Sequence, residues 1–322
     1  MAVYTKINKK NILSIEKIFQ IGKIISFKGI KKGIENTNYF LKTKNHKFIL
    51  TIFEKRVQSK DLPFFMKLMH GLSKLQIQCP KPLEISKGKY LFKIKNKNAC
   101  IVTFLEGKDK ENLTPKDCYE IGKNIAKLHI ASNKLKLFRK NSLSLSSWPK
   151  LLNKIDDRSK KIQINLHSLM KMNLLIIKKN WPKNLPGGII HGDLFIDNIF
   201  FYQKKFFGFI DFYFSSFDFL SYELAICINS LCFNKKKNKF IFDKSKSSNL
   251  LKGYQKYRKL SVKEKKYFNT LCKGSALRYL LTRVYDYSNT PNNAIIKIKD
   301  PKEYIQKLIF HSKMKKFNDY IN

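Results

Sequence analysis

A change in the apolar pattern near residues 106 and 107 limits the possible folds more than any other feature of the chain. Before it, short β-prone runs alternate with turn residues, and a single helical pattern over residues 61–78 has Asp61 as a possible N-cap and Pro63 in its first turn. The β-prone runs cover residues 21–30, 37–44, 47–53, 90–94 and 99–104. The first hundred residues therefore predict a compact sheet with one helix.

After residue 107 the apolar spacing becomes mostly helical. Helices are predicted around residues 114–128, 151–179, 219–233, 247–257, 263–287 and 301–311. One strand-rich stretch, residues 188–212, interrupts them. The sequence thus predicts an α+β fold with two lobes: a small N-terminal lobe with an antiparallel sheet over residues 1–105, and a larger, mainly helical lobe over residues 106–322.

The net charge of +42 raises the possibility of a nucleic-acid-binding protein. Of the 65 basic residues only six are arginine, so the other 59 are lysine, and they are spread along the chain. AT-rich coding produces such a composition, whereas nucleic-acid sites more often concentrate arginine, lysine and aromatic residues on one face. We therefore expect a solvated lysine-rich surface and no nucleic-acid partner.

The remaining composition argues for a cytoplasmic protein. The six cysteines form no C-x-x-C pair and show no zinc spacing. The first 17 residues are polar and rich in lysine, unlike a signal peptide. The most apolar stretch, residues 206–233, contains Asp211, Asp218 and Glu223, which argue against a membrane span.

The strand-rich stretch carries a group of polar residues suited to chemistry. Residues 190–201 read I-H-G-D-L-F-I-D-N-I-F-F, and residues 206–212 read F-F-G-F-I-D-F. The two apolar runs flank a turn at residues 202–205, so they predict a hairpin. Asp193 and Asn198 precede the hairpin and Asp211 ends it, so the three side chains are expected to converge.

Such a group is suited to phosphoryl transfer. Asp193 would accept the proton of an attacking hydroxyl, and Asn198 and Asp211 would hold Mg²⁺ against nucleotide phosphates. His191 would orient the loop without acting on the substrate. The alternative is a set of ordinary polar turn residues, but the two flanking apolar runs argue against it. Upstream, Gly29, Gly33, Asn36 and Thr37 lie between two predicted strands, where main-chain amides could approach the phosphates, or where the chain could simply turn.

These motifs resemble the choline-kinase and aminoglycoside-phosphotransferase superfamily, and most closely its bacterial homoserine kinases. The segments that carry the resemblance run from residue 1 to about residue 304. They are M-A-V-Y-T, S-F-K-G-I followed by G-I-E-N-T-N-Y-F-L, F-I-L-T-I-F-E-K-R-V, D-L-P-F-F, I-V-T-F-L-E-G, H-G-D-L-F-I-D-N-I-F-F, I-D-F-Y-F, A-L-R-Y-L-L-T-R-V-Y-D and K-D-P-K-E-Y. The resemblance implies a bilobal, protein-kinase-like fold that uses ATP and Mg²⁺ to phosphorylate L-homoserine. It implies Asp193 as the base, Asn198 and Asp211 as magnesium ligands, and Thr103 to Leu105 as the hinge that meets adenine.

One position departs from the superfamily. Many relatives carry a lysine or arginine on the third strand that pairs with the phosphates, and the aligned residue here is Thr51. Lys55, Arg56 or Lys28 could replace it, and the sequence does not decide among them. An inactive kinase is the alternative, and the intact group of Asp193, Asn198 and Asp211 argues against it.

Homoserine needs a cation for its carboxylate and an anion for its ammonium group. In residues 276–287, leucines form one helical stripe, with Tyr279, Arg283 and Asp286 on the opposite side and Arg278 at its flank. We favour Arg283 for the carboxylate and Asp286 for the ammonium group, with Arg278 as the other candidate; the alternative is a solvated helix face. Tyr222 and Glu223, just after the metal loop, are further candidates.

Two other functions remain open from the sequence. A kinase of the same fold could act on another small alcohol, such as choline or an aminoglycoside, although a polycationic substrate suits poorly a chain with 23 acidic and 65 basic residues. A basic nucleic-acid-binding protein would show steeply salt-dependent affinity without ATP turnover. The oligomeric state is not predicted.

Overall fold

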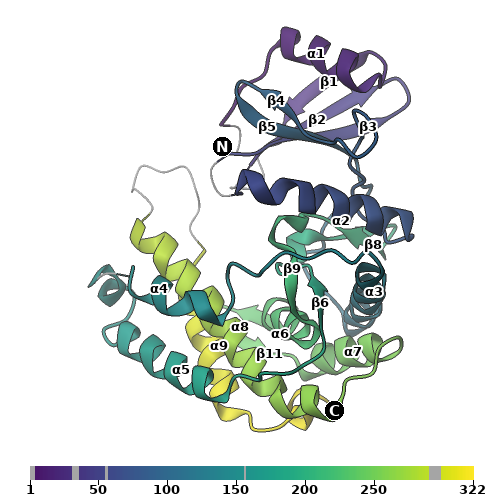
Figure 1. The fold of residues 1–322 in the computed structure, drawn as a ribbon. Helices are drawn as coiled ribbons and strands as arrows, with labels where there is room; N and C mark the ends of the chain where they lie inside the picture. The colour runs from purple at the N-terminus through teal and green to yellow at the C-terminus, as the bar shows by residue number, and fades with distance from the viewer. Residues whose placement is uncertain (1–3, 31–35, 55–56, 156, 290–298) are drawn as a thin grey trace.

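The structure is a computed structural model that describes residues 4–30, 36–54, 57–155, 157–289 and 299–322. Figure 1 shows a sheet at the N-terminal end with one helix on either side of it, placed over a larger and mainly helical part. This arrangement confirms the predicted fold class.

The N-terminal sheet has five antiparallel strands in the order β1-β2-β3-β5-β4. The strands are β1 (Ile24–Gly29), β2 (Thr37–Thr43), β3 (Lys47–Ile52), β4 (Phe92–Ile94) and β5 (Lys97–Thr103). Side chains alternate between two faces along each strand. Leu50 and Ile101 point into a small core with helix α1 (Lys9–Phe19), whereas Cys100 and Val102 on the other face join the main core.

Two helices cover the sheet. Helix α2 (Leu62–Lys74) lies between the sheet and the larger part, with Pro63 in its first turn as predicted. Helix α1 was not predicted, because its sequence is polar apart from a narrow stripe. Ile12 and Ile15 form its buried face, and Asn8 and Asn11 cap its first turn reciprocally.

The larger part surrounds two short pairs of strands with helices. The strand pairs are β6 (Gly187–Ile190) with β9 (Ser216–Phe219), and β7 (Ile199–Tyr202) with β8 (Lys205–Phe209). The helices are α3 (Pro115–Lys134), α4 (Trp148–Leu152), α5 (Leu166–Asn180), α6 (Leu220–Leu231), α7 (Lys244–Gln255), α8 (Val262–Asn289) and α9 (Lys302–Lys313). A further hairpin, β10 (Phe233–Lys236) with β11 (Lys239–Phe242), follows α6 and was not predicted.

One predicted helix, residues 151–179, is wrong in its extent. The chain forms α4 and then, after a separate stretch, α5. Asn153 follows the end of α4, and Asn165 precedes the start of α5. Asparagine favours helix ends because its side chain competes for main-chain hydrogen bonds.

The main core joins both parts of the molecule. It includes Phe65 from α2, Cys100 from β5 and Phe212 from the segment that follows β8. All six cysteines are buried free thiols, and burial raises the pKa of Cys79 and Cys100 to about 12. They therefore act as small apolar residues. Among the helices of the described residues, none is long and apolar enough to cross a membrane.

Candidate active site

The loop after β6 brings Asp193 and Asn198 together. A short 3-10 turn, Ile196–Asn198, leads from the loop into β7. From that turn the Asn198 side-chain amide donates to the main-chain oxygen of Asp193 at 2.8 Å and to its carboxylate Oδ2 at 3.3 Å. Since the amide nitrogen is engaged in this way, the side-chain oxygen is the atom of Asn198 that could bind a metal.

The β7–β8 hairpin returns the chain to the same place. Ile199 pairs with Phe209, and the Ile210 N–H donates to the Asn198 carbonyl at 3.0 Å. Asp211 follows directly, with an exposed side chain and a left-handed main chain at φ 64°. A non-glycine residue in this region is uncommon, and such residues cluster at functional sites. The hairpin therefore brings together the two ends that the sequence predicted to meet.

His191 connects the loop to the far strand. Its fully buried ring donates from Nε2 to the Ile210 carbonyl at 2.8 Å and packs 4.6 Å from the Phe212 ring. Burial lowers the pKa of His191, so the ring is neutral. These contacts hold the ring against the main chain of the hairpin, and the orienting role of His191 stays a prediction.

Glu223 is placed differently from the prediction. Its side chain is 0% exposed, and its carboxylate accepts hydrogen bonds from the main-chain N–H groups of His191 and Gly192. A substrate cannot reach a carboxylate enclosed in this way, so the structure corrects the assignment of Glu223 to substrate binding. On α3, buried His129 lies with its Nε2 3.8 Å from Glu223 and its Nδ1 2.9 Å from the Tyr254 hydroxyl. No local sequence signal indicated this support, because it joins three distant helices.

The carboxylate of Asp193 has a raised pKa. Burial is the main cause, and the positive charges of Arg278 and Lys299 oppose it. The Tyr279 hydroxyl lies 3.1 Å from Asp193 Oδ1 and 3.2 Å from the Gly192 carbonyl, within hydrogen-bonding reach of both. A desolvated carboxylate held by fixed donors is suited to accept a proton at neutral pH. Lys299 was not predicted here; its Nζ lies 4.8 Å from the centre of the Phe195 ring.

The two candidate arginines of α8 have different surroundings. Both are buried, at 6% exposure for Arg278 and 7% for Arg283, so the interpretation as a solvated helix face is wrong. Arg283 donates to Glu303 at 2.6 Å and to the Asp300 carbonyl at 2.8 Å. An arginine paired in this way is not available to a substrate carboxylate, which corrects the preference for Arg283. Asp286 is half-buried on the same helix.

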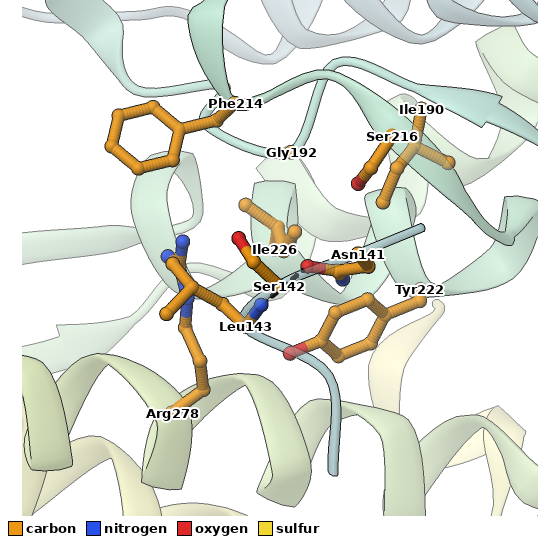
Figure 2. A pocket seen from close by; sticks show the side chains of 10 residues that line it. All are labelled: Asn141, Ser142, Leu143, Ile190, Gly192, Phe214, Ser216, Tyr222, Ile226 and Arg278. Carbon is orange, nitrogen blue, oxygen red and sulfur yellow. Dashed lines mark hydrogen bonds between the residues drawn. The ribbon is translucent and has the colours of Figure 1, made fainter. Parts of the chain in front are cut away.

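Arg278 instead lines a small pocket beside the loop that carries Gly192 and Asp193. The pocket also contains Tyr222, Gly192 and Ser216, and Figure 2 shows Arg278 rising from α8 toward the side chains that enter from the other elements. Of the five side chains proposed for the substrate, the structure therefore brings Tyr222 and Arg278 together. Asp286 is not among the residues that line this pocket.

The residues proposed for the nucleotide phosphates lie at the ends of β1 and β2. Gly29 ends β1, and buried Thr37 begins β2. The Thr37 hydroxyl donates to Glu54 at 2.7 Å, and Asn36 Oδ1 accepts from the Glu54 N–H at 3.4 Å. Asn36 and Thr37 therefore anchor the base of the connecting loop. Gly33, Lys55 and Arg56 lie outside the described residues, so their assignments stay predictions.

At the position on β3 where many relatives carry a cation, Thr51 makes a polar contact. The buried Thr51 hydroxyl donates to Asn38 at 2.8 Å, and Lys28 is exposed on β1. At the expected hinge, Thr103 exchanges hydrogen bonds of 2.9 Å with the main chain of Lys81, and Leu105 is buried.

The oxygen atoms at the hairpin suit a hard divalent cation. In the described part of the chain, no group of three or more His, Cys, Asp or Glu side chains could hold a metal alone. A cation bound by Asn198 and Asp211 would need further oxygen ligands, and Mg²⁺ commonly takes them from substrate phosphates and water. The available side chains therefore fit a cation that is bound together with a nucleotide.

Comparison with known proteins agrees with this geometry. Residues 26–241 match the phosphotransferase enzyme family. A homoserine kinase of Brucella anthropi is 39% identical over 320 residues, covering 99% of this chain and 97% of the relative. A homoserine kinase of Rhizobium meliloti is 40% identical over 311 residues, covering 97% and 94%.

Solved structures with little sequence similarity share the fold. An amicoumacin kinase in complex with AMP-PNP, Ca²⁺ and Ami superposes with a TM-score of 0.72 at 13% identity and covers 97% of both chains. A choline kinase from Streptococcus pneumoniae superposes with a TM-score of 0.65 at 16% identity, covering 95% of this chain and 98% of its own. By its sequence relatives, the chain belongs to the phosphotransferase enzyme family and, within it, to the homoserine kinases.

Proposed function

We propose that the protein transfers the γ-phosphoryl group of ATP to the hydroxyl of L-homoserine, giving ADP and O-phospho-L-homoserine. The arrangement of Asp193, Asn198 and Asp211 around one hairpin carries this proposal, because Asp193 would act as proton acceptor beside Asn198 and Asp211 as oxygen ligands of Mg²⁺. The similarity to homoserine kinases over nearly the whole chain supports the choice of substrate.

In the proposed mechanism, Asp193 accepts the proton of the homoserine hydroxyl as that oxygen attacks phosphorus. Tyr279 and Asn198 fix the orientation of its carboxylate. When bound, Mg²⁺ supplies neutralisation of phosphate charge, and Asn198 and Asp211 are the residues that would hold it. Most of the catalysis would come from positioning, since phosphoryl transfer requires little covalent chemistry from the protein.

The nucleotide would lie between the two parts of the molecule. Gly29, Asn36 and Thr37 would bind the phosphates through their main-chain amides, and Thr103 to Leu105 would contact adenine. We divide the chain at residues 105 and 106, so that residues 1–105 bind the nucleotide and residues 106–322 carry the catalytic and substrate groups. The main core extends across this division, which favours a hinge over a flexible tether.

A coupled assay of ADP release tests the function directly. The acceptors to compare are L-homoserine, serine, threonine, choline and kanamycin, each with ATP and Mg²⁺. We expect kcat/KM to be highest for L-homoserine. A preference for choline or kanamycin would contradict the proposed substrate. Absence of turnover combined with salt-dependent binding of DNA or RNA would favour the nucleic-acid alternative.

A further inference from the structure

The pocket beside Gly192 is lined without a single acidic side chain. Its ten lining residues are Asn141, Ser142, Leu143, Ile190, Gly192, Phe214, Ser216, Tyr222, Ile226 and Arg278. Arg278 is the one charged residue among them. The volume of ≈ 10 Å³ is about that needed by one water molecule, so a carboxylate would enter only with movement of the lining side chains.

Arg278 differs from the other arginines whose side chains the structure describes. Arg139 is paired with Asp61 at 2.8 Å, Arg258 with Glu264 at 2.9 Å and Arg283 with Glu303 at 2.6 Å. Within the described part of the chain, no carboxylate lies within ion-pair distance of Arg278. Its guanidinium instead lies 3.9 Å from the centre of the Tyr279 ring. The charge of Asp193 acts on Arg278 without a direct ion pair. A buried charge without a directly paired carboxylate is costly, which is expected where a ligand supplies the partner.

Two buried hydroxyl groups in the same pocket also lack a hydrogen-bond partner among the described residues. They belong to Ser216, which is 1% exposed, and Tyr222, which is 2% exposed. In Figure 2 both side chains enter the pocket, Ser216 from β9 and Tyr222 from α6. Buried polar groups are normally hydrogen-bonded. These two hydroxyls and Arg278 therefore form a set of donors whose acceptor a bound ligand could supply.

The pocket is connected to the proton acceptor through one side chain. The Tyr279 ring stacks on Arg278, and the Tyr279 hydroxyl lies 3.1 Å from Asp193 Oδ1. Gly192, which immediately precedes Asp193, lines the pocket itself. A short substrate could therefore place one end against Arg278 while its hydroxyl meets Asp193.

We propose that Arg278, Tyr222 and Ser216 form a carboxylate subsite that makes the enzyme select amino acids over amines as phosphoryl acceptors. A planar guanidinium can hold a carboxylate with two parallel hydrogen bonds, and the two hydroxyls can donate further ones. The same positive charge would repel choline and other cationic alcohols. This inference rests on the proposed function, since it identifies what part of homoserine is recognised.

A substrate that lacks only the carboxylate provides the test. 3-Aminopropan-1-ol is L-homoserine with its carboxylate replaced by hydrogen, so the ratio of the two kcat/KM values measures recognition of that group. We expect the wild type to favour homoserine by at least about 10³-fold, because a site built for a polar group strongly rejects an analogue without it. Arg278 also acts on the charge of Asp193, so its loss lowers turnover of both substrates, and Arg278→Met should lower kcat/KM for homoserine by about 10²-fold more than the value for 3-aminopropan-1-ol.

A matched pair of variants tests whether an effect on KM is specific to the Tyr222 hydroxyl in the pocket or is shared by another buried hydroxyl. Tyr222→Phe should raise the KM for homoserine several-fold. Tyr304→Phe removes the same atom from another buried tyrosine whose hydroxyl has no partner among the described residues, but Tyr304 does not line the pocket. We expect Tyr304→Phe to keep the wild-type KM.

A binding measurement on the wild type keeps the test independent of variant stability. L-2-Aminobutyrate is homoserine without its hydroxyl and should inhibit competitively at least about 10²-fold more tightly than propan-1-amine, which also lacks the carboxylate. If the wild type does not phosphorylate homoserine, the proposed function fails. If it does so but the inhibitors bind equally, or if folded Arg278→Met keeps the wild-type ratio of substrates, the pocket holds only water and the subsite is refuted.

Discussion

Replacing Glu223 by glutamine would alter the support of the catalytic loop without changing the size of the side chain. The carboxylate is fully buried and accepts hydrogen bonds from the N–H groups of His191 and Gly192. A hydrogen bond to a charged group contributes about 1.5–3 kcal/mol. Glutamine keeps one acceptor oxygen but turns an amide N–H toward one of the donors. We therefore expect the free energy of unfolding to fall by about 2–4 kcal/mol.

The catalytic consequence follows from the position of Asp193, which is the next residue after Gly192. A small displacement of the main chain at Gly192 moves the proton acceptor, and a shift of about 1 Å can lower a rate by about 10²-fold. In Glu223→Gln we expect kcat to fall by at least about tenfold, with smaller changes in the KM for homoserine and ATP. Steady-state kinetics and thermal unfolding on the same preparation measure both effects, and Tm should decrease by about 3–6 °C.

Glu264→Gln is the matched control. Glu264 is also fully buried, and it accepts hydrogen bonds from Arg258 and from the Ser261 N–H, both at 2.9 Å. It lies on α8 about 22 Å along the helix axis from Tyr279. This variant should lose stability and keep the wild-type kcat. If Glu223→Gln is destabilised as much as the control but retains full kcat, Glu223 contributes to stability alone and does not position Asp193.

Three further predictions concern the catalytic residues and the surface charge. Asp193→Asn should lower kcat by about 10²–10⁴-fold. Burial raises the pKa of Asp193 in the folded protein, so its ionised form destabilises the fold and the variant should raise Tm at pH 8. This gain in Tm should disappear as the pH falls below the ordinary aspartate range, where the carboxyl is protonated in both states. Asp211→Asn should weaken productive binding of nucleotide and be partly rescued by excess Mg²⁺, and an unchanged nucleotide affinity with no response to Mg²⁺ would exclude Asp211 as a metal ligand. Neutralising the exposed Lys235–Lys237 should leave kcat and KM unchanged, so a loss of activity would assign a role to the bulk charge.

The catalytic hairpin could be predicted because its geometry is local. Two apolar runs around a four-residue turn must bring their ends together, and Asp193, Asn198 and Asp211 lie at those ends. The position of Glu223 could not be predicted in this way. The proximity of Glu223 to Asp211 in the sequence suggested a place in the site. The direction of the Glu223 side chain, however, depends on how α6 packs against the loop and against His129 on α3.

The choice between Arg278 and Arg283 failed for a similar reason. The two positions differ by about 140° on an ideal helix, and one stripe of leucines was taken to mark the buried side of α8. In the structure α8 packs against α5, α6 and α9, so most of its circumference is buried and a polar position does not indicate solvent. What distinguishes the two arginines is Glu303 at the start of α9, which pairs with Arg283.

The structure shows what the few arginines of this chain have in common, which the composition alone could not show. In a chain with 59 lysines among 65 basic residues, each of the four arginines whose side chains the structure describes lies close to an aromatic ring. The distances from guanidinium carbon to ring centre are 5.0 Å for Arg139, 5.7 Å for Arg258, 3.9 Å for Arg278 and 4.4 Å for Arg283. A planar guanidinium can stack on a ring and still donate hydrogen bonds from its edge, whereas an ammonium group is a more strongly hydrated point charge. Arginine therefore occurs here where a buried or half-buried side chain must do both. The free edge of Arg278 in the pocket beside Gly192 is the one for which the described chain supplies no acceptor.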